Sequence, residues 1–582
     1  MDLQRFKHLA RRTLYGRGVQ IWYDPSFRLP ISALEGGTGF EPRRADYVAW
    51  FLLDSWIIAP KSLRKPNPVR YRNLSRVHTE DYLESLQHPL TLARIFAADE
   101  SDINVDEVLR AVRLATGATV EAALDCALHG VSALNLFGGF HHAGRDAGGG
   151  FCAINDIAAA VDALRRKAFQ GQIVILDLDA HPPDGLSSCL ADAPRVWVGS
   201  LSGESWGPVP GVDDTVLPRG TGDAVYLRAL EGLLARMPRP AFAFVIAGGD
   251  VLAGDRLGKL ALSLDGVRRR DLRVCEALGG VPSVWLPGGG YGKNAWRAFA
   301  GTALALVCRT NETIPEDYEP MRARFGRIAS HLSLDKLEGS AEMSNRDLEE
   351  ALGIRPPGKP RLLGYYSEEG LEYALSHYGL LPHLRRLGYT AFRVAIEPAS
   401  LGDALRLYGT MRGEEFMLIE AVLEKRKIAD VEVLYVHWLT LRNPGARFSH
   451  GRPQLPGQDS PGLGLAREMG WVFMRIARRL GLQGVVYRPA WFHTAYTGRY
   501  HFVFVDSARQ GRFEAMIRDL SNVHLVEVTK AAAEGRIRMN GEPYTWEADE
   551  MVFWLGPPRL AQAEVEAERS RVSFSIVPLE AG

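Results

Sequence analysis

The chain has 582 residues, about twice what one hydrophobic core usually supports, so at least two domains are expected. Apolar residues make up 46% and charged residues 24% of the chain, which excludes a largely disordered or membrane-embedded protein. The 69 basic and 69 acidic residues balance, so no global positive field exists to attract nucleic acid, and direct nucleic-acid binding is not expected.

Residues 1–18 are predicted to be an N-terminal extension. This basic segment is not followed by the apolar stretch and cleavage site of a signal peptide. No run of ~20 apolar residues follows anywhere in the chain, so no membrane span is expected. The five cysteines are widely spaced and form no C-x-x-C pair, which favours a reducing compartment. A cytoplasmic protein is therefore predicted.

Residues 19–310 alternate short apolar runs with helical segments. The runs at 172–180, 195–201, 241–250 and 282–291 are typical of buried strands. Between the strands lie amphipathic stretches such as 155–167, which opens with the capping residues Asn155 and Asp156. The alternation predicts an α/β fold with a parallel sheet flanked by helices.

The composition changes after Cys308. A charged, proline-containing stretch at 309–327 and a second proline-rich stretch at 354–361 predict a linker over 311–361. Residues 362–560 have their own strand and helix alternation, which predicts a second α/β or α+β domain. Residues 561–582 are expected to be a tail.

Polar residues end the predicted strands of the first domain, where ligands of parallel sheets bind. Asp179 and His181 follow one strand two residues apart, and Asp250 follows another. Each alone could be a loop residue or a helix cap. Together they supply the three protein ligands of a catalytic zinc site with an open position. The two oxygen donors and one nitrogen donor would also accept Fe²⁺.

Three further groups are candidates for catalysis. The tandem His141 and His142 could move a proton between a metal-activated water and a leaving amine. Asp177 and Asp184 flank the predicted metal ligands and could each orient one imidazole. Tyr291 follows three glycines, which would let its phenol swing toward a substrate carbonyl and stabilise an oxyanion.

Five motifs of this domain resemble the histone deacetylase family in order and spacing. They read HHA followed by GGGFCAIND, then DLDAHPPDG, GGDVLAGDRLG and PGGGY. The resemblance covers about residues 19–308. It implies the arginase/deacetylase fold and zinc-dependent hydrolysis of an N-acyl-lysine amide, with the roles given above for His141, His142, Asp177, Asp184 and Tyr291.

The resemblance also implies two sets of binding residues. A structural K⁺ site is expected at Asp177, Asp179, His181, Ser200 and Leu201. The acyl-lysine tunnel is expected to be lined by Gly150, Phe151, Val209, Leu257 and Gly289.

The chain departs from the family pattern at three places. Pro182 and Pro183 follow His181 and stiffen a loop without removing a ligand. Val209 aligns with the residue that forms the second aromatic wall of the tunnel. This smaller side chain would admit acyl groups larger than acetyl. Leu257 stands where polyamine-specific members carry glutamate, so a polyamine substrate is disfavoured.

The second domain has a weaker resemblance to the GNAT acetyltransferase superfamily. A predicted strand at 431–441 is followed by the glycine-containing loop QLPGQDSPGLGLA, an amphipathic helix and a strand at 484–490. In that superfamily such a loop opens a helix whose N-terminal amides hold the pyrophosphate of acetyl-CoA. Here Gln458 is one residue out of register and Asp459 takes its place. A turn that only joins strand to helix would explain these glycines equally well.

Three functions therefore stay open. The leading one is a zinc-dependent deacylase acting on acylated protein lysine. The others are a bifunctional protein whose second domain binds acyl-CoA, and a deacylase of a small N-acyl metabolite whose second domain recruits a partner.

Overall fold

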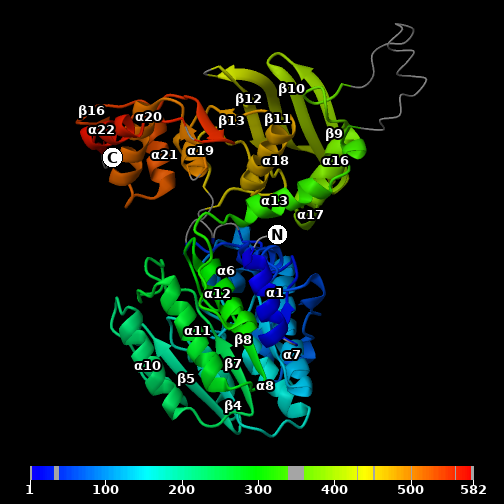
Figure 1. Cartoon of the computed structure of the whole chain (residues 1–582), viewed down its shortest axis with the longest axis vertical. Coiled ribbons are helices and arrows are strands. Elements are labelled where there is room, and N and C mark those ends of the chain that lie inside the picture. Colours follow the sequence, from blue (N-terminus) through cyan, green and yellow to red (C-terminus); the bar gives the residue numbers. More distant parts are fainter. Residues whose placement is uncertain are drawn as a thin grey trace. The chain divides into compact units, whose positions relative to one another are not determined.

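The computed structural model describes residues 3–16, 18–31, 34, 38–338, 360–428, 430–449, 453–499, 501–557 and 559–578. These fall into two compact units, Met1–Ala323 and Arg324–Gly582 (Figure 1). The division lies inside the segment predicted to be a linker. Part of that segment is helical, because α13 spans Pro320–His331 and α14 spans Leu334–Glu338.

The first unit is built on an eight-stranded sheet whose neighbouring strands are all parallel. Its central strands are fully buried and mainly apolar, as the sequence predicts for a sheet covered on both faces. In sheet order the strands are β2 (Leu63–Arg64), β1 (Gln20–Trp22), β3 (Ser132–Asn135), β8 (Ser283–Leu286), β7 (Phe242–Ile246), β4 (Ile173–Asp177), β5 (Val196–Ser202) and β6 (Val212–Val216).

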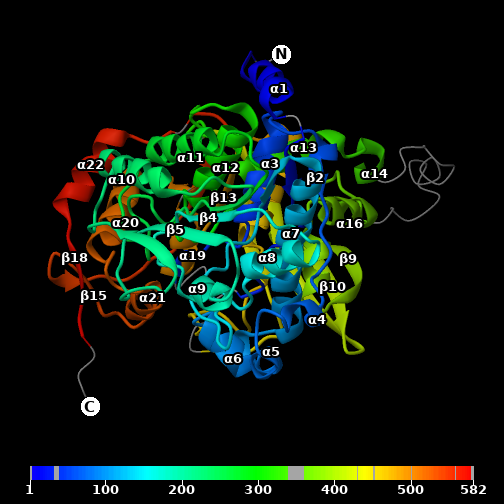
Figure 2. The ribbon, with the colours of Figure 1, turned by 90° about the horizontal axis from the view of Figure 1, so that it is seen from below.

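Helices flank this sheet, with α10, α11 and α12 on one side and α7 and α8 on the other (Figure 2). The predicted cap of α8 is present, because the Asn155 side chain accepts a hydrogen bond from the backbone N–H of Ala158. The α-helices are α1 (Leu3–Tyr15), α3 (Arg44–Asp54), α4 (Tyr71–Leu74), α5 (Glu80–Ser85), α6 (Pro89–Ile95), α7 (Val105–His129), α8 (Asp156–Arg166), α9 (Asp184–Leu190), α10 (Asp223–Arg236), α11 (Leu264–Leu278) and α12 (Ala295–Cys308); short 3₁₀ turns span Pro60–Ser62 and Glu100–Asp102.

The second unit contains a mixed seven-stranded sheet. Four strands form an antiparallel meander: β9 (Thr390–Ala399), β10 (Gly402–Met411), β11 (Glu414–Ile428) and β12 (Val431–Leu441). The helix α18 (Ala466–Arg479) then leads to β13 (Gly484–Tyr487), which pairs in parallel with β12. The strands β17 (Met551–Trp554) and β14 (Val503–Phe504) complete the sheet. The unit also contains α16 (Glu368–His377) and α17 (Leu380–Arg386).

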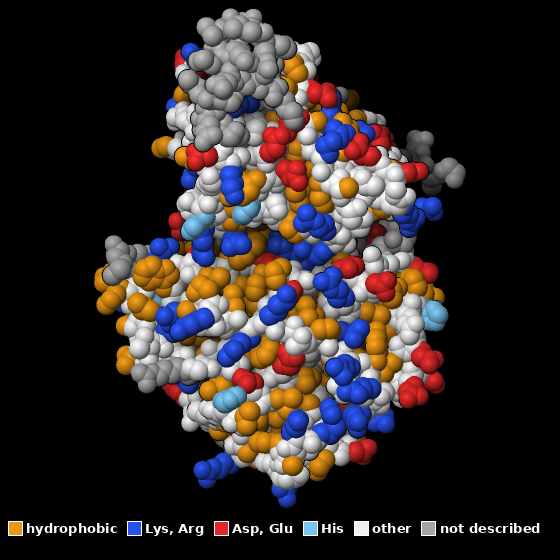
Figure 3. Space-filling model, turned by 90° about the vertical axis from the view of Figure 1, so that its right-hand side faces the viewer, with side chains coloured by type: hydrophobic (Ala, Val, Ile, Leu, Met, Phe, Trp, Pro, Cys, Tyr) orange, Lys and Arg blue, Asp and Glu red, His pale blue; other side chains and the backbone are white. Residues whose placement is uncertain are grey.

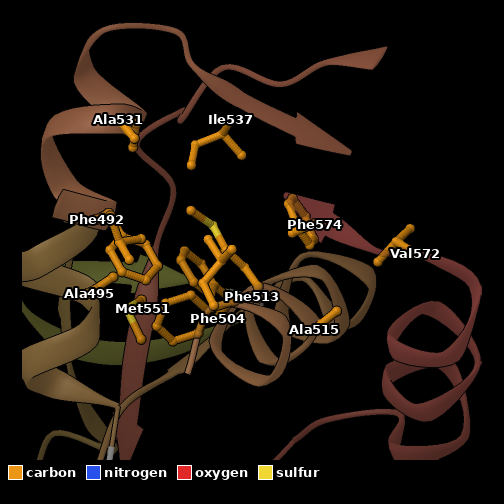
Figure 4. Packing of buried hydrophobic residues seen from close by; sticks show 14 residues of the cluster. Phe492, Ala495, Phe504, Phe513, Ala515, Ala531, Ile537, Met551, Val572 and Phe574 are labelled. Atoms are coloured by element: carbon orange, nitrogen blue, oxygen red, sulfur yellow. The ribbon is translucent and has the colours of Figure 1, made fainter. Parts of the chain in front are cut away.

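A separate hydrophobic cluster lies at the end of the second unit. It packs Phe492, Phe504, Phe513 and Met551 against small residues of neighbouring helices (Figure 4). The elements around it are α19 (Phe492–Gly498), α20 (Ser507–Asp519), α21 (Leu525–Ala533), α22 (Gln562–Arg571) and the small antiparallel sheet of β15 (Ile537–Met539), β16 (Glu542–Pro543) and β18 (Phe574–Ile576).

The segment 561–582, expected to be a tail, instead supplies α22 and β18 to this cluster. The sequence of α22 is mostly charged, and Val565 is its one buried apolar side chain. Most of the residues around Val565 in the sequence are exposed. Val572 and Phe574 are buried as well. Burial of these few side chains orders a segment that composition alone describes as polar.

Candidate active site

Asp179, His181 and Asp250 lie together at the carboxyl ends of β4 and β7. One ligand atom from each side chain lies within 4.8 Å of the others. The Nδ1 atom of His181 is 3.1 Å from Asp179 Oδ1 and 3.0 Å from Asp250 Oδ2. Burial disfavours a charged imidazole, but the hydrogen bonds and charges of the two carboxylates outweigh it and raise the pKa of His181 to about 11. Two buried carboxylates thus converge on one imidazole nitrogen, and a bound metal ion would take the place of the proton on that nitrogen.

Backbone groups of other loops hold these carboxylates in place. Gly289 N–H donates to Asp179 Oδ2 at 2.6 Å, and Ala180 N–H donates to Asp250 Oδ1 at 3.0 Å. Close approach at Gly289 requires glycine, because a Cβ atom there would lie 2.5 Å from Asp250 Oδ2. The site is therefore fixed by three chain segments that are far apart in sequence.

The tandem histidines each pair with one predicted carboxylate. His141 Nδ1 donates to Asp177 Oδ2 and His142 Nδ1 donates to Asp184 Oδ1, both at 2.7 Å. The two partners differ in exposure, since the Asp177 side chain is fully buried and that of Asp184 is 51% exposed. The pairs are thus alike in geometry and unlike in electrostatics.

The pKa values of the two imidazoles are shifted in opposite directions. For His141, the charges of Asp177 and Asp179 outweigh the cost of burial and raise its pKa to about 9. Burial and the neighbouring charge of His141 lower the pKa of His142, and the hydrogen bond to Asp184 only partly opposes this. At neutral pH the geometry therefore favours a charged His141 beside a neutral His142.

Tyr291 stands across the cavity with its ring centroid 5.5 Å from that of Phe151. Burial and the charges of Asp179 and Asp250 raise the pKa of its phenol well above the usual range, so the hydroxyl stays protonated and can donate a hydrogen bond. The cavity between them is lined by Leu29, Phe40, Arg44, Phe137, Gly139, Phe140, His141, His142, Gly150, Phe151, Cys152, Asp179, His181, Gly288, Gly289 and Tyr291.

The predicted tunnel residues are only partly brought together. Gly150, Phe151 and Gly289 line the cavity, whereas Val209 and Leu257 are absent from its lining. Beside the histidines lies a different aromatic ring, that of Trp206, with its centroid 5.1 Å from His142 and 5.9 Å from His181. Trp206 lies three residues before Val209 in the same loop and is, like Val209, outside the lining of the cavity.

Two positioning residues went unrecognised in the sequence. Asp255 lies in the quoted motif GGDVLAGDRLG, and its carboxylate accepts hydrogen bonds from the backbone N–H groups of Tyr291, Leu257 and Gly258. Arg44 of α3 lines the cavity and donates to Gly288 O at 2.9 Å. Burial lowers the pKa of Arg44, although the nearby Tyr291 and the carboxylates of Asp179, Asp250 and Asp255 oppose the shift. The motif could have drawn attention to Asp255, but nothing in the local sequence distinguishes Arg44.

Ser200 and Leu201, predicted to help hold K⁺, lie at the end of β5 and are fully buried. Asp177 pairs in register with Ser200 across the sheet. A hydrogen bond from the Ser200 hydroxyl opposes the rise in pKa that burial gives the Asp214 carboxyl group of β6.

Comparisons with known proteins find similarity over the first unit. Residues 39–307 match the family described as the histone deacetylase domain. Histone deacetylase 2 of Arabidopsis thaliana is 32% identical over 298 residues, which cover 48% of this chain and 77% of that protein. An uncharacterized protein of Picosynechococcus is 33% identical over 291 residues, covering 48% of this chain and 93% of that protein. Among solved structures, the HD domain of HDA15 matches 50% of this chain and 89% of that one at 23% identity, with a TM-score of 0.42.

Proposed function

This chain belongs to the histone deacetylase family and is a hydrolase of the deacetylase class, and from that premise we propose that its first unit hydrolyses an N-acyl-lysine amide with the help of a bound zinc ion. The observation that carries the proposal is the convergence of two His–Asp pairs, three ligand-type side chains and one phenol around a single cavity. Acylated protein lysine is the preferred substrate, and a small N-acyl amide is the alternative.

Asp179, His181 and Asp250 would hold the ion. When bound, zinc supplies Lewis-acid polarisation of the amide carbonyl and makes a water molecule acidic near neutral pH. Two oxygen donors and one imidazole nitrogen suit zinc with an open position, and they would also accept Fe²⁺.

The proton transfers fall to the tandem histidines. The neutral His142 can take a proton from the attacking water at Nε2, because its Nδ1 is bonded to Asp184, and can then pass the proton to the departing lysine amine. The charged His141, held by Asp177, would stabilise the negative charge that develops nearby. The Tyr291 hydroxyl would donate a hydrogen bond to the oxygen of the former carbonyl. Phe151 and Trp206 would enclose the apolar part of the acyl-lysine side chain.

A structural K⁺ site is proposed at Asp177, Asp179, His181, Ser200 and Leu201. The burial of Ser200 and Leu201, and the pairing of Ser200 with Asp177 across the sheet, support it. A cytoplasmic location is proposed as well, with support from the five free cysteines. Within the described part of the chain, no helix is long and apolar enough to cross a bilayer.

A direct test uses the purified full chain and a panel of acyl-lysine peptides that differ in acyl length, together with small N-acyl amides. We expect amide hydrolysis to require zinc and to be inhibited by a hydroxamate. Turnover by metal-free protein at the rate of the zinc-loaded protein would refute the mechanism. The order of kcat/KM across the panel identifies the substrate class.

A second function is proposed for the second unit, namely binding of acyl-CoA. The parallel crossover from β12 through α18 to β13 supports it, because anionic ligands bind where such helices begin. Among the residues that the structure describes, no side chain caps the start of α18. The unfavourable Asp459 is paired with Arg442 at 3.3 Å, so its charge is partly offset.

Isothermal titration of the full chain with acetyl-CoA tests this second function. Binding that weakens when a bulky residue replaces Gly464 (φ +71°), in the loop before the helix, would support it. The absence of heat and of any thermal shift would leave a recruitment role for this unit.

A further inference from the structure

The helix α1 lies outside the part of the chain that matches the deacetylase family, since it spans Leu3–Tyr15 and the match begins at residue 39. It lies at the periphery of the first unit (Figure 2). Its sequence LQRFKHLARRTLY contains four basic residues and no acidic residue. Nothing in the proposed chemistry uses this helix.

The face of α1 that packs against the first unit is polar. His8 is only 3% exposed and bonds through Nδ1 to Ser55 O at 2.8 Å and through Nε2 to Glu312 Oε2 at 2.9 Å. One turn earlier, Gln4 Nε2 donates to Glu312 Oε1 at 2.5 Å. These bonds fix the rotation of the helix about its own axis.

The opposite face is apolar and exposed to solvent. Leu3, Phe6 and Leu14 are exposed by 69%, 52% and 71%. At 3.6 residues per turn these three side chains form one stripe along the helix. A surface helix normally buries its apolar stripe, so this reversed orientation marks an interaction surface. We call Leu3, Phe6 and Leu14 the α1 stripe.

Basic residues border the α1 stripe. Lys7 and Arg11 are both exposed, and they lie one turn apart beside Leu3 and Leu14. Arg5 lies over the ring of the partly exposed Trp56, 6.0 Å from its centroid. Basic side chains are also scattered among hydrophobic ones over the face of the first unit drawn in Figure 3. The α1 stripe and the basic residues beside it are complementary to a surface that has an apolar layer under a negatively charged one.

The size of the stripe argues against a protein partner. A helix of 13 residues is about 20 Å long and about 10 Å wide, so its outer face offers roughly 200 Å². A stable protein interface needs roughly 800 Å² from each partner. A membrane surface has no such requirement, because an amphipathic helix inserts its own apolar face among the lipids.

We propose that α1 docks the protein onto membranes rich in anionic phospholipid. The α1 stripe enters the boundary between headgroups and acyl chains, and Lys7 and Arg11 contact lipid phosphates. The chain is electrically neutral as a whole, so the attraction is local to this helix. This inference is independent of the proposed catalytic chemistry.

The test is flotation of the full chain with phosphatidylcholine vesicles that contain or lack phosphatidylserine. We expect binding to the anionic vesicles at low salt and its loss at high salt. The double variant Phe6→Ser/Leu14→Ser should weaken binding by at least about tenfold, because each side chain loses its burial in lipid. Lys7→Glu/Arg11→Glu should weaken binding to the anionic vesicles only.

Matched controls come from α10, which carries an exposed aliphatic and an exposed basic residue. Val225→Ser and Arg228→Glu should bind vesicles as the parent does. The proposal is overturned if the parent protein does not float with anionic vesicles, or if the α1 variants float equally well. It is also overturned if light scattering shows that the α1 variants dissociate an oligomer while vesicle binding is absent, because the stripe would then be a protein contact.

Discussion

Replacing Gly150 with alanine tests whether the position of His142 limits catalysis. Gly150 has φ +51°, and a Cβ atom there would lie 2.3 Å from His142 Cδ2 and 2.8 Å from His142 Cγ. Ordinary contact begins at 3.4 Å, so the imidazole or the loop must move by about 1 Å. The left-handed backbone costs alanine a further ~1 kcal/mol. Because a 1 Å misplacement of a catalytic group costs about 10²-fold, we expect kcat to fall about 100-fold.

The assay is steady-state hydrolysis of an acyl-lysine reporter peptide by the zinc-loaded full chain. Zinc content should stay at the parent level, because the substitution touches no proposed metal ligand. Gly149→Ala is the matched control, since no heavy atom lies within 4 Å of a Cβ there and its φ is not positive. Wild-type kcat in folded Gly150→Ala would refute the idea that this loop positions His142.

Three further outcomes follow from the same geometry. Tyr291→Phe should lower kcat by about 10²- to 10³-fold with little change in KM or thermal stability, because only a donor to the developing oxyanion is removed; an unchanged kcat would contradict the role. Asp250→Asn should weaken zinc binding at least about 100-fold by titration against a competing chelator, and equal affinity would exclude Asp250 as a ligand. Burial lowers the pKa of His78 from 6.5 to about 4 in the folded chain. As the pH falls, His78 is therefore protonated in the unfolded chain at a higher pH than in the folded chain. The free energy of unfolding, measured with urea, should decrease by about 3 kcal/mol between pH 6.5 and pH 4. His78→Gln should remove this part of the pH dependence, whereas His129→Gln should not.

The sequence predicted the parallel sheet and the grouping of its strand ends for a simple reason. Strands buried on both faces are continuous apolar runs, and polar residues that end such runs meet at one edge of the sheet. The spacing of Asp177, Asp179 and His181 at the end of β4, together with Asp250 after β7, was therefore enough to place these groups near one another.

The rest of the cavity depends on contacts between distant segments. Arg44 reaches Gly288 across 244 positions of the chain, and no local pattern encodes that hydrogen bond. Trp206 lies in an exposed loop after β5, and the path of that loop decides which of its residues faces His142. The aromatic neighbour of His142 therefore could not be assigned from the sequence, and the role of Val209 stays a prediction. The helix α22 was missed because one buried valine among charged residues gives no amphipathic pattern.

All residues that line the cavity lie between Leu29 and Tyr291, so the first unit contains the complete set of groups proposed for hydrolysis. Within the described part of the first unit, α1 adds no side chain to the lining of the cavity. Substitutions in the α1 stripe or in the α18 loop are therefore expected to change where the enzyme acts or which ligands it binds, while kcat on a small soluble substrate stays constant. A change in that kcat would show that these parts influence the arrangement of His142 and Tyr291, and the chemistry could then no longer be assigned to the first unit alone.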